Sequence, residues 1–71
     1  MSKWVEVPVV IMKIYAVEIE DNETVENAIN YAMEDCMCGE NVEIDYSNVV
    51  VSENEHQAEQ IRRFADELIS L

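Results

Sequence analysis

Basic side chains are scarce in this chain of 71 residues, which has 4 Lys and Arg against 16 Asp and Glu. The formal net charge at pH 7 is therefore −12 with His neutral. Proteins that bind nucleic acid contact its phosphates through clustered Lys and Arg, and four basic residues cannot form such a cluster. This scarcity argues against direct binding to nucleic acid.

Long hydrophobic runs are also missing. The most apolar stretch near the N-terminus, residues 7–12, is interrupted by Pro8 and followed by Lys13. A secretory signal needs roughly 7–15 apolar residues and a membrane helix about 20, so this stretch predicts a strand instead. No Gly- or Ser-rich linker divides the chain, and its one Gly is Gly39. We therefore expect one domain, residues 1–71, located in the cytoplasm without a membrane span.

Groups suited to catalysis or metal binding are few. The one His, His56, lies in the polar run 53–57, which is typical of an exposed first helical turn. Cys36 and Cys38 lie among acidic residues that disfavour a reactive thiolate, and a structural zinc site needs four ligands. A disulfide two residues apart is strained, and cytoplasmic thiols stay reduced. We expect no enzyme, metal or cofactor; a thiol or metal carrier using both cysteines remains a further alternative.

Apolar residues alternate along residues 3–20. The apolar odd-numbered positions are Val5, Val7, Val9, Ile11, Tyr15, Val17 and Ile19. Alternation with many β-branched residues predicts a strand that has one buried face. About 17 residues is long for one strand, so we expect a bulge or bend at Lys13, the charged residue on the apolar side.

The next segment has helical spacing over residues 23–37. Its apolar positions are Val25, Ala28, Ile29, Ala32, Met33 and Cys36, which share one helical face. Acidic and cap-forming residues at 20–24 precede this stripe, and they favour the positive end of a helix dipole. Gly39 follows, where a left-handed residue would end the helix.

Alternation resumes over residues 42–51. Val42, Ile44 and Tyr46 alternate with polar residues, and a Val run follows at 49–51. The polar interruption at 45–48 is either a tight turn between two short antiparallel strands or a kink in one strand. We favour the hairpin.

A second helix is predicted from about residue 52 to the end of the chain. Either Ser52 with Glu55 or Asn54 with Gln57 would form its capping box. The buried stripe is expected to comprise Ala58, Ile61, Phe64, Ala65, Leu68 and Leu71. The pairs Glu59–Arg63 and Arg62–Asp66 have the spacing of ion pairs on the outer face.

These elements predict an α+β fold in the order β-α-β(-β)-α. Because each element has one apolar face, we expect a two-layer sandwich: a small antiparallel sheet of two or three strands with both helices on one face. The far face of the sheet, carrying Trp4 and Met12, would then stay open and partly apolar. Such a face favours a homodimer or a protein partner.

The negative charge is concentrated after residue 17. Residues 1–17 contain Lys3, Lys13 and Glu6, whereas Arg62 and Arg63 face fifteen acidic residues in 18–71. We predict a partner-binding surface made of Glu18, Glu20, Asp21, Glu23, Glu26, Glu34 and Asp35. A net charge of −12 exceeds the magnitude of about 2–8 that keeps a small domain soluble, and it opposes compaction.

Two stretches of this chain resemble small proteins encoded by bacteriophages and prophages. They are VPVVIMKIYAVEIEDNETVENAINYAMED at residues 7–35 and VEIDYSNVVVSE at residues 42–53. The similar proteins include anti-CRISPR and anti-restriction inhibitors of host defence, several of which are small, acidic and non-enzymatic. The resemblance assigns no role to a particular residue.

Charge and resemblance together predict a non-enzymatic acidic binding protein. It would mimic the charge of nucleic acid and block a basic, nucleic-acid-binding protein of host defence, in the host cytoplasm. The alternative is a structural or accessory protein that oligomerises through the open sheet face, with the charge serving solubility.

Overall fold

The computed structural model describes residues 2–10, 13–36 and 43–71 as an α+β fold. Its strands are β1 (Ser2–Val9), β2 (Lys13–Glu20), β3 (Val50–Val51) and β4 (Glu67–Ile69). They form one sheet in the order β3-β1-β2-β4, in which β4 runs parallel to β2 and the other neighbours are antiparallel. The predicted class is confirmed, but the sheet is mixed and has four strands, not two or three antiparallel ones.

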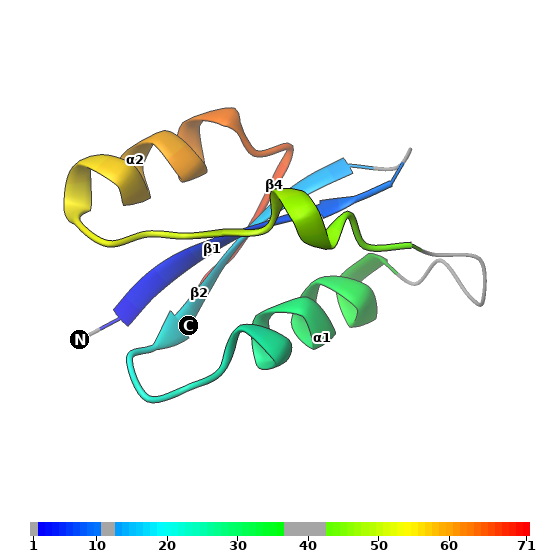
Figure 1. The fold of residues 1–71 in the computed structure, drawn as a ribbon, viewed down its shortest axis with the longest axis horizontal. Helices are drawn as coiled ribbons and strands as arrows, with labels where there is room; N and C mark the ends of the chain where they lie inside the picture. The colour runs from blue at the N-terminus through cyan, green and yellow to red at the C-terminus, as the bar shows by residue number, and fades with distance from the viewer. Residues whose placement is uncertain (1, 11–12, 37–42) are drawn as a thin grey trace.

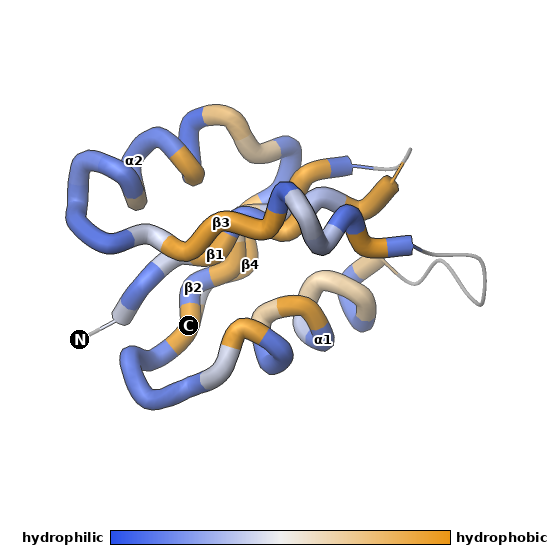
Figure 2. Tube along the Cα trace, in the orientation of Figure 1, coloured by the Kyte–Doolittle hydropathy of each residue, from blue (hydrophilic) through white to orange (hydrophobic). Residues whose placement is uncertain are grey.

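The two helices cover opposite faces of the sheet, which corrects the prediction that both lie on one face. Helices α1 (Val25–Cys36) and α2 (Glu55–Phe64) lie on either side of the strands (Figure 1). Figure 2 shows the hydrophobic strands between them and hydrophilic residues along the start of α2. The sheet is therefore the middle layer of three.

Strands β1 and β2 form a hairpin where one long strand with a bulge at Lys13 was predicted. Val9 pairs with Lys13, and Ser2 pairs with Glu20. In this register each residue pairs with one of the same parity, so the odd-numbered positions of both strands share one face. The alternation therefore continues through the turn as it would in a single strand. Ile11 lies outside the described residues.

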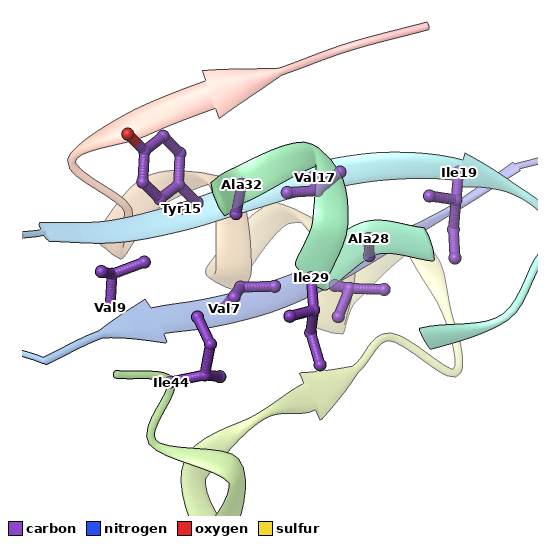
Figure 3. Close-up of a cluster of buried hydrophobic side chains, with 10 residues drawn as sticks. Val7, Val9, Tyr15, Val17, Ile19, Ala28, Ile29, Ala32 and Ile44 are labelled. Atoms are coloured by element: carbon purple, nitrogen blue, oxygen red, sulfur yellow. The ribbon is translucent and has the colours of Figure 1, made fainter. Parts of the chain in front are cut away.

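The main core lies between the odd-numbered face of the hairpin and α1 (Figure 3). Its buried members are Val5, Val7, Val9, Tyr15, Val17, Ile19, Ala28, Ile29, Ala32 and Ile44. The helical stripe of α1 is thus largely confirmed. Met33 departs from it, because 40% of its surface is exposed. The predicted helix end at Gly39 lies outside the described residues.

Helix α2 covers the even-numbered face, which was predicted to stay open. Ala16 on that face is fully buried, and α2 contacts both β1 and β2. Ala58 and Ile61 form the buried side of α2. Trp4 is only half-buried there, and Met12 lies outside the described residues. The oligomerisation alternative therefore loses the exposed sheet face on which it was based.

The chain leaves the second helix earlier than predicted. The helix α2 ends at Phe64, and Asp66 then binds the edge of β2: its N–H donates to the Ile14 carbonyl at 2.7 Å, and its Oδ2 accepts from the Ile14 N–H at 2.8 Å. These two bonds align residues 67–69 as β4. The predicted buried stripe is therefore wrong beyond Ile61: Phe64, Leu68 and Leu71 are exposed.

The local contacts of α2 agree in part with those predicted. Asn54 caps the helix by accepting from the Gln57 N–H at 2.8 Å, which selects one of the two predicted capping registers. The Glu59–Arg63 pair forms at 3.8 Å, as predicted. Arg62 pairs with Glu55 at 2.9 Å instead of with Asp66.

Residues 43–51 run along the outer side of β1. Ile44 bridges Val9, and β3 pairs with Val5 and Glu6 of the same strand. The short 3-10 helix η2 (Tyr46–Asn48) separates these two contacts. Both halves thus pair with β1 and not with each other, so the segment is a kinked strand and not the favoured hairpin. Among the described residues, no helix has the length and hydrophobicity needed to cross a membrane.

Candidate acidic binding surface

The junction between β2 and α1 is held by hydrogen bonds across residues 20–27. The Glu23 N–H donates to the Glu20 carbonyl at 3.0 Å, and Glu23 Oε1 accepts from the Glu20 N–H at 2.9 Å. Thr24 Oγ1 accepts from the Asn27 N–H at 3.3 Å, as a helix-capping hydroxyl does. This network fixes the direction in which α1 leaves the sheet.

Glu23 belongs to this framework more than to the outer surface. Its Oε2 accepts from the Tyr31 hydroxyl at 2.7 Å and from the Asn27 amide at 3.4 Å. Hydrogen bonds from the Glu20 N–H, and then from Tyr31, lower the pKa of the Glu23 carboxyl, because they favour its charged form. Glu23 is only half-exposed, so a partner has limited access to it.

Glu18 lies on the other face of the sheet from α1. It is half-buried and directly opposite Trp4 in the hairpin register. Its Oε2 accepts from Ser2 Oγ at 2.6 Å, and its Oε1 accepts from the Leu71 N–H at 3.2 Å. These bonds, Ser2 first, lower the pKa of the Glu18 carboxyl. Glu18 therefore does not join Glu26 and Glu34 on one surface.

The other predicted residues are exposed and follow α1 from one end to the other. The α1 acidic surface comprises Glu20, Asp21, Glu26, Glu34 and Asp35. Glu26, Asn30 and Glu34 are spaced four residues apart, which places them along one side of the helix. Met33 lies in the same exposed region of α1. Five of the seven predicted residues are thus exposed, and two of them, Glu26 and Glu34, share one side of α1.

The last turn of α1 has a charge arrangement that opposes its dipole. Glu34 and Asp35 lie there, and the turn has no basic residue. The carboxyl end of a helix carries partial negative charge, so carboxylates destabilise it. In α2 the arrangement is favourable: Glu55 lies in the first turn, with Arg62 and Arg63 in the last.

The ion pairs that the basic residues form among the described residues lie outside α1. Lys13 pairs with Glu67 at 3.2 Å, while Arg62 and Arg63 pair with residues of their own helix. Lys3 Nζ donates to the Asp21 carbonyl at 3.2 Å. The sequence of α1 itself contains no Lys or Arg. The side of α1 that carries Glu26 and Glu34 therefore keeps a negative potential. Lys13, whose pKa is raised first by its bond to Glu67, also interacts with the charge of Asp35.

The described residues form no metal-type cluster of three or more His, Cys, Asp or Glu side chains. Cys36 is disulfide-bonded, which corrects the expectation of reduced thiols; Cys38 lies outside the described residues. His56 is exposed, and its Nε2 lies 3.5 Å from the Gln60 amide.

Comparisons with family models, curated proteins and solved structures find no match to this chain.

Sequence reasoning missed the contact between Trp4 and Arg62. The guanidinium carbon lies 5.2 Å from the centre of the Trp4 ring, a cation–π distance. The two residues are 58 positions apart, and with both helices placed on one face nothing in the sequence joins them.

Proposed function

We propose that this chain is a non-enzymatic binding protein whose α1 acidic surface mimics the charge of nucleic acid. Its partner is a basic, nucleic-acid-binding protein, which it blocks by occupying the site for the phosphate backbone. The resemblance to small phage inhibitors favours a host defence protein as the partner and the host cytoplasm as the place where they meet.

The observation that carries this proposal is the pair Glu34 and Asp35 in the last turn of α1. Carboxylates at this end of a helix lower stability, whereas Lys or Arg there would raise it. In the same chain, α2 ends with Arg62 and Arg63, the basic residues that stabilise the carboxyl end of a helix. The unfavourable carboxylates are therefore particular to α1. A stability cost confined to one exposed helix end is typical of residues that serve binding.

The shape of the surface suits such a partner. The carboxylates of α1 lie along a helix whose first turn is held by hydrogen bonds of Glu23 and Thr24. Their relative positions should therefore change little when a partner binds. A preorganised surface loses less entropy when a partner binds. Exposed Met33 adds an apolar contact within the acidic region. Long-range attraction between opposite charges would speed the encounter.

A capture experiment with defined competition tests this function. The tagged chain is incubated with lysate at low salt, and bound proteins are released with increasing double-stranded DNA or increasing NaCl. We expect a basic protein that DNA displaces and whose affinity falls steeply with salt. Once that protein is purified, this chain should inhibit its binding to nucleic acid.

The matched variants are Glu34→Gln on α1 and Glu59→Gln on the outer side of α2. Each removes one exposed carboxylate and changes the net charge equally. Weaker inhibition with Glu34→Gln alone supports the α1 acidic surface. Equal inhibition by both variants, or capture that DNA does not reverse, contradicts charge mimicry by this surface.

A further inference from the structure

A cleft of about 540 Å³ lies between the first turn of α2 and the end of the hairpin. Its floor includes Trp4 and Glu18, which are paired across β1 and β2 on the α2 side of the sheet. Ser52 joins the two walls, because it exchanges hydrogen bonds of 2.8 and 2.9 Å with the Trp4 backbone. Asp21 lines the cleft as well as belonging to the α1 acidic surface.

The cleft already holds one guanidinium group, that of Arg62. This group lies over the Trp4 ring at 5.2 Å and donates to Glu55 Oε1 at 2.9 Å. An aromatic face flanked by a carboxylate is the environment that arginine favours, because its planar cation stacks and hydrogen-bonds together. Because Arg62 already covers this part of the Trp4 ring, a ligand must lie beside Arg62 and not in its place.

The charges lining the cleft leave it negative. Four carboxylates, from Glu18, Asp21, Glu53 and Glu55, face two cations, from Lys3 and Arg62. Arg62 pairs with Glu55, and Lys3 Nζ donates to the Asp21 carbonyl. The hydrogen bonds that lower the pKa of Glu18 keep its carboxylate ionised at neutral pH. An anionic ligand is disfavoured here and a cationic one attracted.

We propose that this cleft receives an arginine side chain of the basic partner, beside Trp4 and between the carboxylates of Glu18 and Glu53. This inference rests on the proposed function only in taking the partner to be basic. Arginine fits better than lysine, because its planar, weakly hydrated guanidinium can donate to two carboxylates at once. The shared residue Asp21 makes the cleft continuous with the α1 acidic surface, so one partner reaches both.

The intrinsic fluorescence of Trp4 provides a direct test, because it is the only Trp in the chain. The full chain is titrated at low salt with a peptide of six arginines, and in parallel with a peptide of six lysines. We expect a saturable change in Trp4 emission with both peptides, with a lower half-saturating concentration for the arginine peptide than for the lysine peptide. Absence of any saturable change, or equal affinity for both peptides, overturns the proposal.

Matched variants locate the binding. Glu53→Gln should lower the affinity for the arginine peptide roughly 2- to 5-fold, as expected for loss of one exposed ion pair. Glu59→Gln makes the same charge change outside the cleft and should leave the Trp4 titration unchanged. Equal weakening by both variants contradicts a local site. Circular dichroism confirms that each variant is folded.

Calorimetry separates this proposal from the proposed function. If the arginine peptide binds without altering Trp4 emission, and Glu34→Gln removes that binding, the cleft proposal is wrong while the α1 acidic surface stands. If the Trp4 titration responds to Glu53→Gln and not to Glu34→Gln, the cleft is an arginine site in its own right.

Discussion

The Tyr31 hydroxyl donates a 2.7 Å hydrogen bond to Glu23, eight residues earlier in the chain. The bond connects the middle of α1 to the turn that precedes the helix. It shows that a carboxylate in the densest acidic stretch has a structural role. Charge density alone therefore does not identify the residues that face a partner, and hydrogen-bond partners separate Glu23 from exposed Glu26.

Replacing Glu23 with Gln should lower the melting temperature at pH 7. The folded state holds the pKa of Glu23 below its usual value of about 4.3, so its stabilising effect is complete above that pH. The effect is lost as the pH falls through the folded-state pKa. The difference between the variant and the parent should therefore shrink on acidification, as followed by thermal melts from pH 7 to pH 2.

Glu26→Gln is the control for that comparison, because Glu26 is exposed in the first turn of the same helix. Glu26→Gln should lower the melting temperature at pH 7 less than Glu23→Gln does. A Glu23→Gln chain that melts with the parent at every pH would show that the bonds to Tyr31 and Glu20 do not stabilise the junction.

Tyr15→Phe should leave the stability unchanged or raise it. The Tyr15 ring is fully buried, and its hydroxyl makes no hydrogen bond of ordinary geometry among the described residues, although the Asp35 carboxylate lies near enough to act on it. Burial raises the pKa of Tyr15. A buried unpaired polar group costs about 1–3 kcal/mol, and Phe removes that group while keeping the ring. Chemical denaturation measures the difference, and a loss above about 1 kcal/mol would reveal a partner for the hydroxyl.

Ile29→Asp and Met33→Asp distinguish the two sides of α1. Ile29 is 7% exposed and packs in the core, whereas Met33 is 40% exposed. The free-energy cost of burying an unpaired carboxylate exceeds the small stability of a chain this size. Ile29→Asp should therefore abolish cooperative melting. Met33→Asp should still melt cooperatively. If the two variants behaved alike, the orientation of α1 on the sheet would be wrong.

The melting temperature should be higher in 0.5 M NaCl than in 10 mM NaCl. The net charge of −12 repels itself, and added salt shortens the range of that repulsion to a few ångströms. Differential scanning calorimetry over a salt series measures the effect. A melting temperature that falls with salt would mean that the three ion pairs of Lys13, Arg62 and Arg63 outweigh the repulsion.

The sequence predicted α1 and the core positions of β1 and β2, because both depend on local periodicity. It missed the hairpin turn because the Val9–Lys13 register preserves parity and no Gly, Asn or Asp marks residues 10–12. It also extended α2 past Phe64, because Leu68 and Leu71 continue the helical spacing. The bonds from Asp66 to Ile14 that end this pattern join residues 52 positions apart.

The sequence predicted which segment carries the negative charge, but it did not predict which of its carboxylates lie together. Placing both helices on one face made Glu18 look exposed beside Glu20, whereas it faces α2 and bonds to Ser2. Likewise the sequence contained Trp4 and Arg62 but no local signal that they meet. Long-range pairing in the sheet determines both facts, and local patterns do not report it.

Glu34→Lys tests the binding role of the α1 acidic surface most directly, through stability and affinity measured on the same variant. A lysine in the last turn of α1 complements the helix dipole, so the free energy of unfolding should rise by about 0.3–1 kcal/mol. Affinity for the basic partner should fall at the same time, while Glu59→Lys, with the same charge change on α2, retains it. A Glu34→Lys chain that is more stable and binds as tightly as the parent would contradict the proposed role of this surface.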